Sequence, residues 1–218
     1  MRAYYLCPSQ FGVSNVALRR LKISRFSDLN DPFELLAVDL ADKGHRGVFR
    51  KMKDELNKNR GLVCLARTWQ NPLIWGHYAD RHTGMALGFD VAEHLAKPVV
   101  YARRPLKIGI DPKTGKPNLT FDVVERLLRT KFHDWKYEDE LRLFVNLDHE
   151  TVESGLYFIH FDVSLVLREI VLGPRCELPV GRIRDMVQSY DPEVTVFKSR
   201  IAFSSFRVVE DRTLLHNV

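Results

Sequence analysis

The stretch Trp135-Lys-Tyr-Glu-Asp-Glu-Leu-Arg-Leu-Phe-Val-Asn-Leu147 opens on charged and aromatic residues and closes on apolar ones. Its second half, residues 141–147, predicts an apolar β-strand. Glu138, Glu140 and Arg142 follow one another with a period of two, so on a strand they share one face. Three charges on one face of a central strand are costly in a dry core. The stretch therefore predicts either a wet cleft or an internal pair between Arg142 and a glutamate.

The sequence on both sides of this strand predicts further helices and strands. Helical spacing and helix-start signals predict helices at 14–22, 47–59, 72–78, 119–132 and 180–189, and Asp162-Val-Ser predicts the start of another. Apolar runs predict strands at 2–7, 23–26, 62–67, 85–90, 98–101, 156–161, 169–174, 194–199 and 204–210. The strands cluster late and do not alternate regularly with helices, which favours the α+β class over a doubly wound sheet.

The composition is that of a globular chain. It has 218 residues, of which 45% are hydrophobic and 28% charged, so disorder and collagen-like repeats are excluded. This length suits one domain, which we expect to span residues 1–218. The loop residues Pro, Gly, Asn and Asp concentrate at 110–118, which predicts a loop excursion near 105–118.

Charge and cysteine usage limit the setting of the protein. The formal net charge of +5 permits a nucleotide or a nucleic acid as a partner without requiring one. The three cysteines are far apart and form no zinc-binding spacing, which favours a reducing compartment and no metal site. We find neither a signal peptide nor an apolar run long enough for a membrane span, so the expectation is a cytoplasmic protein without a membrane partner.

Two further polar motifs are candidates for a site. In Ser27-Asp-Leu-Asn-Asp-Pro-Phe-Glu34, the side chains of Asn30 and Asp31 either bond their own backbone or line a pocket. In the segment 69–84, His77 and Asp80 are three residues apart, which on a helix places them on a shared face. That pair either orients a reactive imidazole or is structural.

Together the three motifs resemble a bacterial family known as domain of unknown function 2971. The resemblance rests on Tyr4-Tyr5, Asn30-Asp-Pro-Phe-Glu34, Trp75 to Gly84 with Gly88-Phe-Asp90, Trp135 to Arg142, and Glu169 to Pro174. It covers most of the chain. The motifs are specific for membership in the family and say little about activity.

The layout is also distantly similar to that of ADP-ribosyltransferases. This resemblance implies a split, mostly antiparallel β core flanked by short helices, and NAD as the substrate. The spacing of Glu138 and Glu140 is similar to the E-x-E of the arginine-modifying branch. It implies that Glu140 is catalytic and that Glu138 acts on the acceptor side. His77 is a third catalytic candidate because of its spacing from Asp80. The residues implied to bind NAD are Tyr5, Asn30, Asp31, Arg67, Tyr78 and Arg142.

The lead hypothesis is therefore an NAD-dependent ADP-ribosyltransferase, a bacterial toxin or phage-defence effector that modifies a protein or a nucleic acid. Carboxylates near the ribose suit the oxocarbenium-like state in which the nicotinamide–ribose bond breaks. Two alternatives remain open at this stage. One is a nucleic-acid or nucleotide-binding module without enzymatic activity, and the other is a metal-independent RNase that uses His77 and Glu140.

Overall fold

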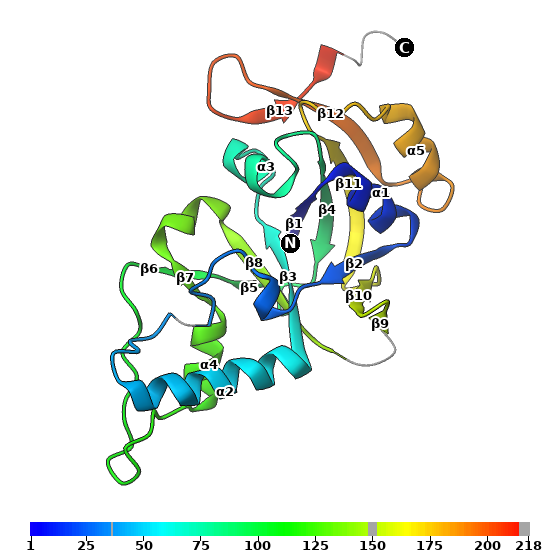
Figure 1. The fold of residues 1–218 in the computed structure, drawn as a ribbon. Coiled ribbons are helices and arrows are strands. Elements are labelled where there is room, and N and C mark those ends of the chain that lie inside the picture. The colour runs from blue at the N-terminus through cyan, green and yellow to red at the C-terminus, as the bar shows by residue number, and fades with distance from the viewer. Residues whose placement is uncertain (36, 148–151, 214–218) are drawn as a thin grey trace.

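The main sheet of the protein is mixed but mostly antiparallel. The computed structural model describes residues 1–35, 37–147 and 152–213. Within these residues, eight strands lie in the order β13-β12-β11-β4-β1-β3-β8-β5 (Figure 1). Their bounds are β1 Arg2–Cys7, β3 Arg60–Ala66, β4 Met85–Val91, β5 Lys97–Pro98, β8 Glu140–Asn146, β11 Leu165–Leu172, β12 Thr195–Ile201 and β13 Val208–Glu210. Only β11 and β12 pair in parallel in this sheet.

Two smaller sheets and the helices surround this main sheet. One small sheet has the order β2-β10-β9 and the other pairs β6 with β7. Their bounds are β2 Arg20–Ile23, β10 Leu156–His160, β9 Val152–Glu153, β6 Val100–Ala102 and β7 Thr130–Phe132. The helices are α1 Ser9–Ala17, α2 Lys43–Asn59, α3 Pro72–Tyr78, α4 Phe121–Leu128 and α5 Val180–Gln188, with short 3₁₀ turns η1 Phe26–Asp28 and η2 His133–Glu138. This mixture of elements confirms the predicted α+β class.

The main sheet is split between β1 and β3. β1 pairs with β4 along its whole length, and β3 pairs with β8 along its whole length. Between β1 and β3, however, the pairing within the described residues is limited to Tyr4 and Ala66. Near the start of β3, the backbone of Leu62 instead exchanges two hydrogen bonds of 2.9 Å with the backbone of Ser24, which follows β2. The two strands therefore diverge, and the segment after β2 covers the gap between them.

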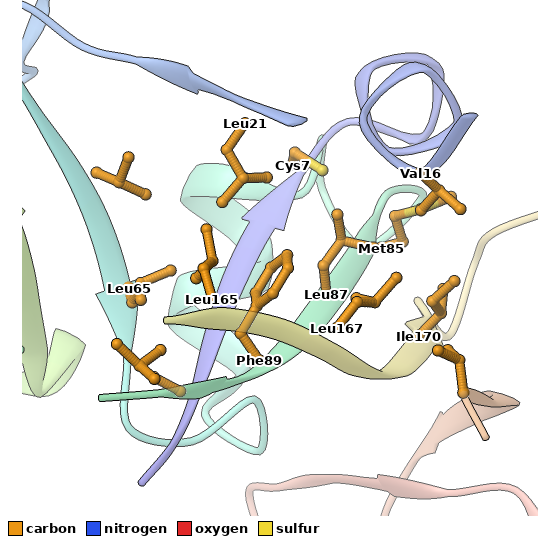
Figure 2. Packing of buried hydrophobic residues seen from close by; sticks show 14 of the residues in the cluster. Cys7, Val16, Leu21, Leu65, Met85, Leu87, Phe89, Leu165, Leu167 and Ile170 are labelled. Atoms are coloured by element: carbon orange, nitrogen blue, oxygen red, sulfur yellow. The ribbon is translucent and has the colours of Figure 1, made fainter. Parts of the chain in front are cut away.

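Apolar side chains fill both faces of the sheet. The largest cluster lies between the sheet, α1, α5 and the small β2-β10 sheet, and Figure 2 shows Leu87, Phe89 and Leu167 at its centre. On the opposite face, α3 buries Trp75, whose indole N–H donates to the carbonyl of Trp69. None of the helices in the described ranges combines the length and apolar character needed to cross a membrane.

Several predicted elements are correct and others are shifted. Helix α3 begins where Pro72 predicts it, because the side chain of Asn71 caps it by accepting from the Leu73 N–H at 3.0 Å. The prediction of a helix over 14–22 is wrong in position. The helix is Ser9–Ala17, and Arg19 has a left-handed φ of 50° that ends it. Residues 20–23 then pair with β10, so the strand predicted at 23–26 lies three residues earlier.

Three other predicted bounds need correction for similar reasons. The helix predicted over 119–132 ends at Leu128, because residues 130–132 pair with β6. The segment Asp162-Val-Ser forms a turn instead of a helix, since the Asp162 carboxylate accepts from the N–H groups of Ser164 and Leu165. The last predicted strand, 204–210, is a strand only from Val208. The excursion near 105–118 contains no helix or strand beyond isolated bridges at Leu106 and Ile110.

Candidate active site

A cleft of about 240 Å³ opens where β1 and β3 diverge. Residues of β1 line one side, residues of β3 the other, and the segment after β2 covers it. The lining combines aromatic, apolar and acidic side chains: Tyr4, Tyr5, Leu6, Ser24, Asp28, Leu29, Asn30, Glu34, Cys64, Leu65, Ala66, Ile74, Tyr78, Lys131, Glu138 and Glu140. All three sequence motifs therefore contribute residues to this cleft.

Two glutamates and one lysine meet at the floor of the cleft. Lys131 Nζ lies 2.6 Å from an oxygen of Glu138 and 3.1 Å from an oxygen of Glu140. Glu138 closes η2 and Glu140 opens β8, while Asp139 between them adopts a left-handed conformation with φ of 45°. Their period of two predicts that the two glutamates are neighbours on one strand face. The structure corrects this prediction, because only Glu140 lies on the strand. The two glutamates converge because the chain turns at Asp139 and because Lys131 binds both.

Arg142 forms a second ion pair with Glu140. Arg142 Nε donates to Glu140 at 2.8 Å, and the two terminal nitrogens of Arg142 donate to the Glu34 carboxylate at 2.6 and 2.9 Å. Arg142 is fully buried, and it also donates to the Leu128 carbonyl at 2.8 Å. The guanidinium is therefore saturated by the protein itself. Arg142 is an internal ion-pair residue and is not free to bind the pyrophosphate of a ligand.

The charges of this network set the protonation of its carboxylates. Burial of Glu140 opposes ionisation, but Arg142 and Lys131 outweigh it and lower the pKa of Glu140 to about 2. Burial has the larger effect at Glu138 and Glu34 and raises the pKa of each above its usual value, despite their cationic partners. Glu140 is therefore a permanent anion at neutral pH, and Glu138 takes up a proton more readily than an ordinary glutamate.

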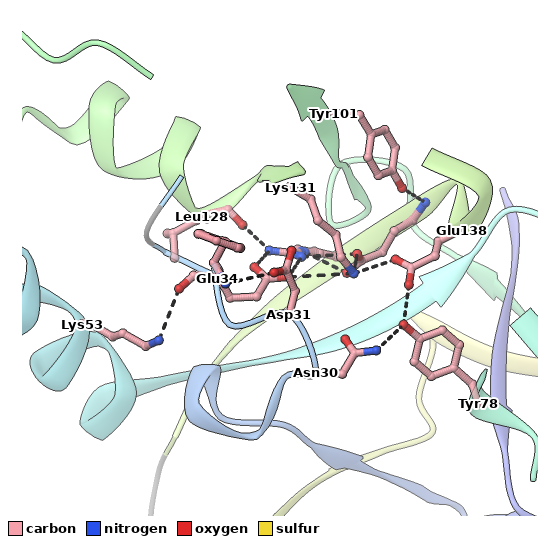
Figure 3. A network of polar contacts seen from close by, with 12 residues as sticks. Asn30, Asp31, Glu34, Lys53, Tyr78, Tyr101, Leu128, Lys131 and Glu138 are labelled. Atoms are coloured by element: carbon pink, nitrogen blue, oxygen red, sulfur yellow. Dashed lines mark hydrogen bonds and ion pairs between the residues drawn. The ribbon is translucent and has the colours of Figure 1, made fainter. Parts of the chain in front are cut away.

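Tyr78 and Asn30 extend the network toward the mouth of the cleft (Figure 3). The Tyr78 hydroxyl donates to Glu138 Oε1 and accepts a hydrogen bond of 2.9 Å from Asn30 Nδ2. Burial and the nearby charge of Glu138 raise the pKa of Tyr78, so this hydroxyl keeps its proton and stays a donor. The structure thus brings Asn30 and Tyr78, two residues that the sequence assigned to one site, into contact with each other.

Two lining residues of the cleft, Tyr5 and Cys64, keep their protons. Tyr5 lies against the divergent edge of the sheet, and burial raises the pKa of its hydroxyl. Cys64 also lines the cleft, but burial and the charge of Glu140 raise the pKa of its thiol well above the usual value. A thiol that keeps its proton is a poor nucleophile. These side chains therefore shape the cleft and supply no reactive group.

Besides Arg142, three predicted site residues lie outside the lining of the cleft. His77 is exposed, stacks on Tyr137 with ring centres 5.8 Å apart, and does not contact Asp80, which accepts a hydrogen bond from Thr83 instead. Asp80 points elsewhere because the chain leaves the helix there in a left-handed conformation. Arg67 is partly exposed and lies 3.4 Å from Asp139.

Asp31 is the third of these residues. It is buried, and one of its oxygens accepts from the Phe33 N–H at 2.9 Å, which closes an Asx turn. Its structural role in the turn was the alternative that the sequence left open. The turn places Glu34, which the sequence did not single out within its motif, beside Arg142. Lys131 was also missed, although it opens the polar stretch that precedes the strand 141–147.

Comparison of the chain with family models, curated proteins and solved structures finds no match. The resemblance to the family of domain of unknown function 2971 therefore stays a prediction. Within the described ranges, no group of three or more His, Cys, Asp and Glu side chains is arranged to hold a metal ion. The three glutamates of the cleft instead surround the ammonium group of Lys131 and the guanidinium of Arg142.

Proposed function

We propose that the cleft binds the nicotinamide–ribose end of NAD and transfers ADP-ribose to an acceptor. The observation that carries this proposal is the ionised, buried Glu140 beside a second carboxylate, Glu138, of raised pKa, both facing a cleft at the split of the sheet. This arrangement agrees with the site implied by the resemblance to ADP-ribosyltransferases.

The proposed reaction uses the opposite pKa shifts of the two glutamates. The bond between the ribose carbon and the nicotinamide nitrogen breaks, and its electron pair leaves with nicotinamide. Positive charge develops on the ribose, and the fixed anion of Glu140 stabilises it. The acceptor then attacks the same carbon, and its proton passes to Glu138. A base with a raised pKa suits this second step because it accepts the proton more readily than an ordinary glutamate does.

The neighbouring residues have supporting roles in this proposal. Tyr78 orients Glu138 through its hydroxyl, and both Tyr78 and Tyr5 line the cleft. A cavity of about 240 Å³ suits one half of a dinucleotide, so the adenosine half extends beyond the cavity. Arg142 and Lys131 act as positioning residues, because both are committed to the glutamates.

The RNase alternative receives less support from the arrangement of residues. It requires His77 and Glu140 to act on one phosphodiester, but His77 is exposed and lies outside the cleft that Glu140 faces. The position of His77 over Tyr137 and beside Trp135 instead suits a packing role.

The test is release of nicotinamide from NAD, measured with and without cell extract as a source of acceptor. We expect Glu140→Gln to lower release by about 10²–10³-fold. Glu138→Gln is expected to lower modification of the acceptor more than hydrolysis of NAD. Glu177→Gln is the matched control, since Glu177 is exposed and remote from the cleft lining.

Two further measurements, of the fold and of NAD binding, separate a loss of activity from a loss of folding. Glu140→Gln leaves two buried cations undercompensated, so its fold must be checked by circular dichroism. Tyr78→Phe removes one hydroxyl and is the milder second variant. Equal release by the wild type, Glu140→Gln and Tyr78→Phe, or absence of NAD binding by the folded wild type in calorimetry, would contradict the proposal.

A further inference from the structure

One end of the molecule carries a net positive charge that the rest of the chain lacks. We define the basic lobe as residues 37–60 and 100–129, which include α2, α4 and the segment between β6 and α4 (Figure 1). These 54 residues hold 14 of the 33 Lys and Arg but only 7 of the 28 Asp and Glu, a formal charge of +7. The other 164 residues carry −2. The modest net charge of the chain therefore conceals a strong asymmetry.

The basic lobe is one packed unit and not a set of scattered segments. Val38, Phe49 and Leu127 form a buried cluster of their own, against which Leu106 and Leu119 pack. The charged residues of these segments are thus held on a common scaffold at the same end of the molecule.

The cations of the basic lobe are largely unneutralised. Ten of them are exposed and have no acidic partner in the described ranges: Lys43, Arg50, Lys51, Arg60, Arg103, Arg104, Lys107, Lys113, Lys116 and Arg126. Two acidic residues of the lobe bind backbone N–H groups instead: Asp39 accepts from Ala41, and Asp111 accepts from Lys113. Elsewhere, Arg2, Arg20 and Arg168 all pair with carboxylates.

Exposed aromatic rings accompany these charges. Phe121, the first residue of α4, is 74% exposed within the basic lobe, and Phe33 is 62% exposed in the turn just before it. Unpaired cations attract a phosphate backbone, while exposed rings offer surfaces on which unpaired bases stack. Together, the unpaired cations and the exposed rings match both parts of a single strand, its phosphates and its unpaired bases.

We propose that the basic lobe binds single-stranded nucleic acid. The lobe adjoins the cleft, because Lys53 of α2 donates to the Glu34 carbonyl at 3.3 Å and the Leu128 carbonyl of α4 accepts from Arg142. A bound strand therefore lies next to the cleft. The inference does not depend on the proposed transferase activity, since binding is measured without NAD.

The experiment measures fluorescence anisotropy of a labelled 20-nucleotide single strand over a range of salt concentrations. We expect the logarithm of the affinity to fall linearly with the logarithm of salt, by ~0.7 per phosphate contacted. The variant Arg50→Ala/Arg103→Ala/Arg104→Ala is expected to weaken binding by about tenfold or more and to reduce the slope by roughly 2. The variant Arg175→Ala/Arg182→Ala/Arg207→Ala removes the same charge outside the lobe and is expected to bind like the wild type.

A third variant tests the stacking part of the proposal. Phe121→Ala is expected to lower single-strand affinity about 5-fold to 100-fold without a change in the salt slope, and to leave duplex binding unaltered. Three outcomes would overturn the inference: no binding of the single strand at low salt, equal losses in the two triple-arginine variants, or equal competition by polyglutamate. Folding of each variant is verified by its unfolding midpoint.

Discussion

Arg142 binds Glu34 through two hydrogen bonds of 2.6 and 2.9 Å, although 108 residues separate them along the chain. Both side chains are buried. The pair ties the turn after η1 to the strand β8 and thereby positions the cover of the cleft over its floor.

Glu34→Gln should destabilise the protein by about 3–5 kcal/mol, because it leaves the buried guanidinium of Arg142 short of one compensating charge. Equilibrium unfolding in urea measures the difference. The control is Glu55→Gln, which breaks the exposed pair with Lys58 and is expected to change stability little. An unchanged midpoint for Glu34→Gln would show that the pair does not form in solution.

Glu140→Gln should lose stability in a manner that depends on pH. The pKa of Glu140 falls from its ordinary value to about 2 on folding, so its contribution is present above the unfolded pKa and is lost as pH falls toward 2. The deficit of the variant relative to wild type should thus be largest above pH ~5 and shrink by about 3 kcal/mol toward pH 2. Urea unfolding at several pH values checks this.

Glu138→Gln should show the opposite slope. The pKa of Glu138 rises on folding, so its contribution is fully present below the unfolded pKa and is lost as pH rises through the folded pKa. The deficit of this variant should therefore be largest at low pH and decrease as pH rises above ~4.5. Parallel profiles for Glu138→Gln and Glu140→Gln, measured in the same urea series, would contradict the assigned protonation states.

Tyr78→Phe should raise the pKa of Glu138 further, because the hydroxyl donates to the ionised carboxylate and favours that form. The carboxyl ¹³C shift of Glu138, followed by NMR through a pH titration, reports the change. Tyr137→Phe serves as the control, since the hydroxyl of Tyr137 makes no hydrogen bond with Glu138 within the described residues. Coincident titration curves for wild type and Tyr78→Phe would exclude this hydrogen bond.

Trp75→Ala should cost about 3–5 kcal/mol and Trp135→Ala clearly less. Trp75 is fully buried. Trp135 is only half-buried and packs against His77 and Tyr137. Thermal unfolding of the two variants under identical conditions compares the costs, and equal losses would mean that Trp135 is packed more tightly than described.

The sequence by itself determined the elements whose signals are local. The strands at 62–67, 85–90 and 141–147 and the helix after Asn71 lie within a few residues of the predicted bounds. Apolar runs, a capping side chain and Pro at the first turn act over a few residues, so they are visible in one stretch of chain. The three polar motifs that contribute to the cleft are also short stretches of chain, so the sequence alone singled them out.

Only the tertiary structure decided which of these residues meet. The helix predicted at 14–22 moved because residues 20–23 pair with a strand more than 130 residues away. Glu34 joins the network through its contact with Arg142, 108 residues away, and Lys131 reaches Glu140, nine residues further along the chain. The left-handed residues Asp139 and Asp80 redirect their neighbours. Side-chain direction after such a turn, and pairing across the sheet, depend on the whole fold. No local spacing encodes them, which is why Glu138 and Glu140 converge on the cleft while His77 lies outside it.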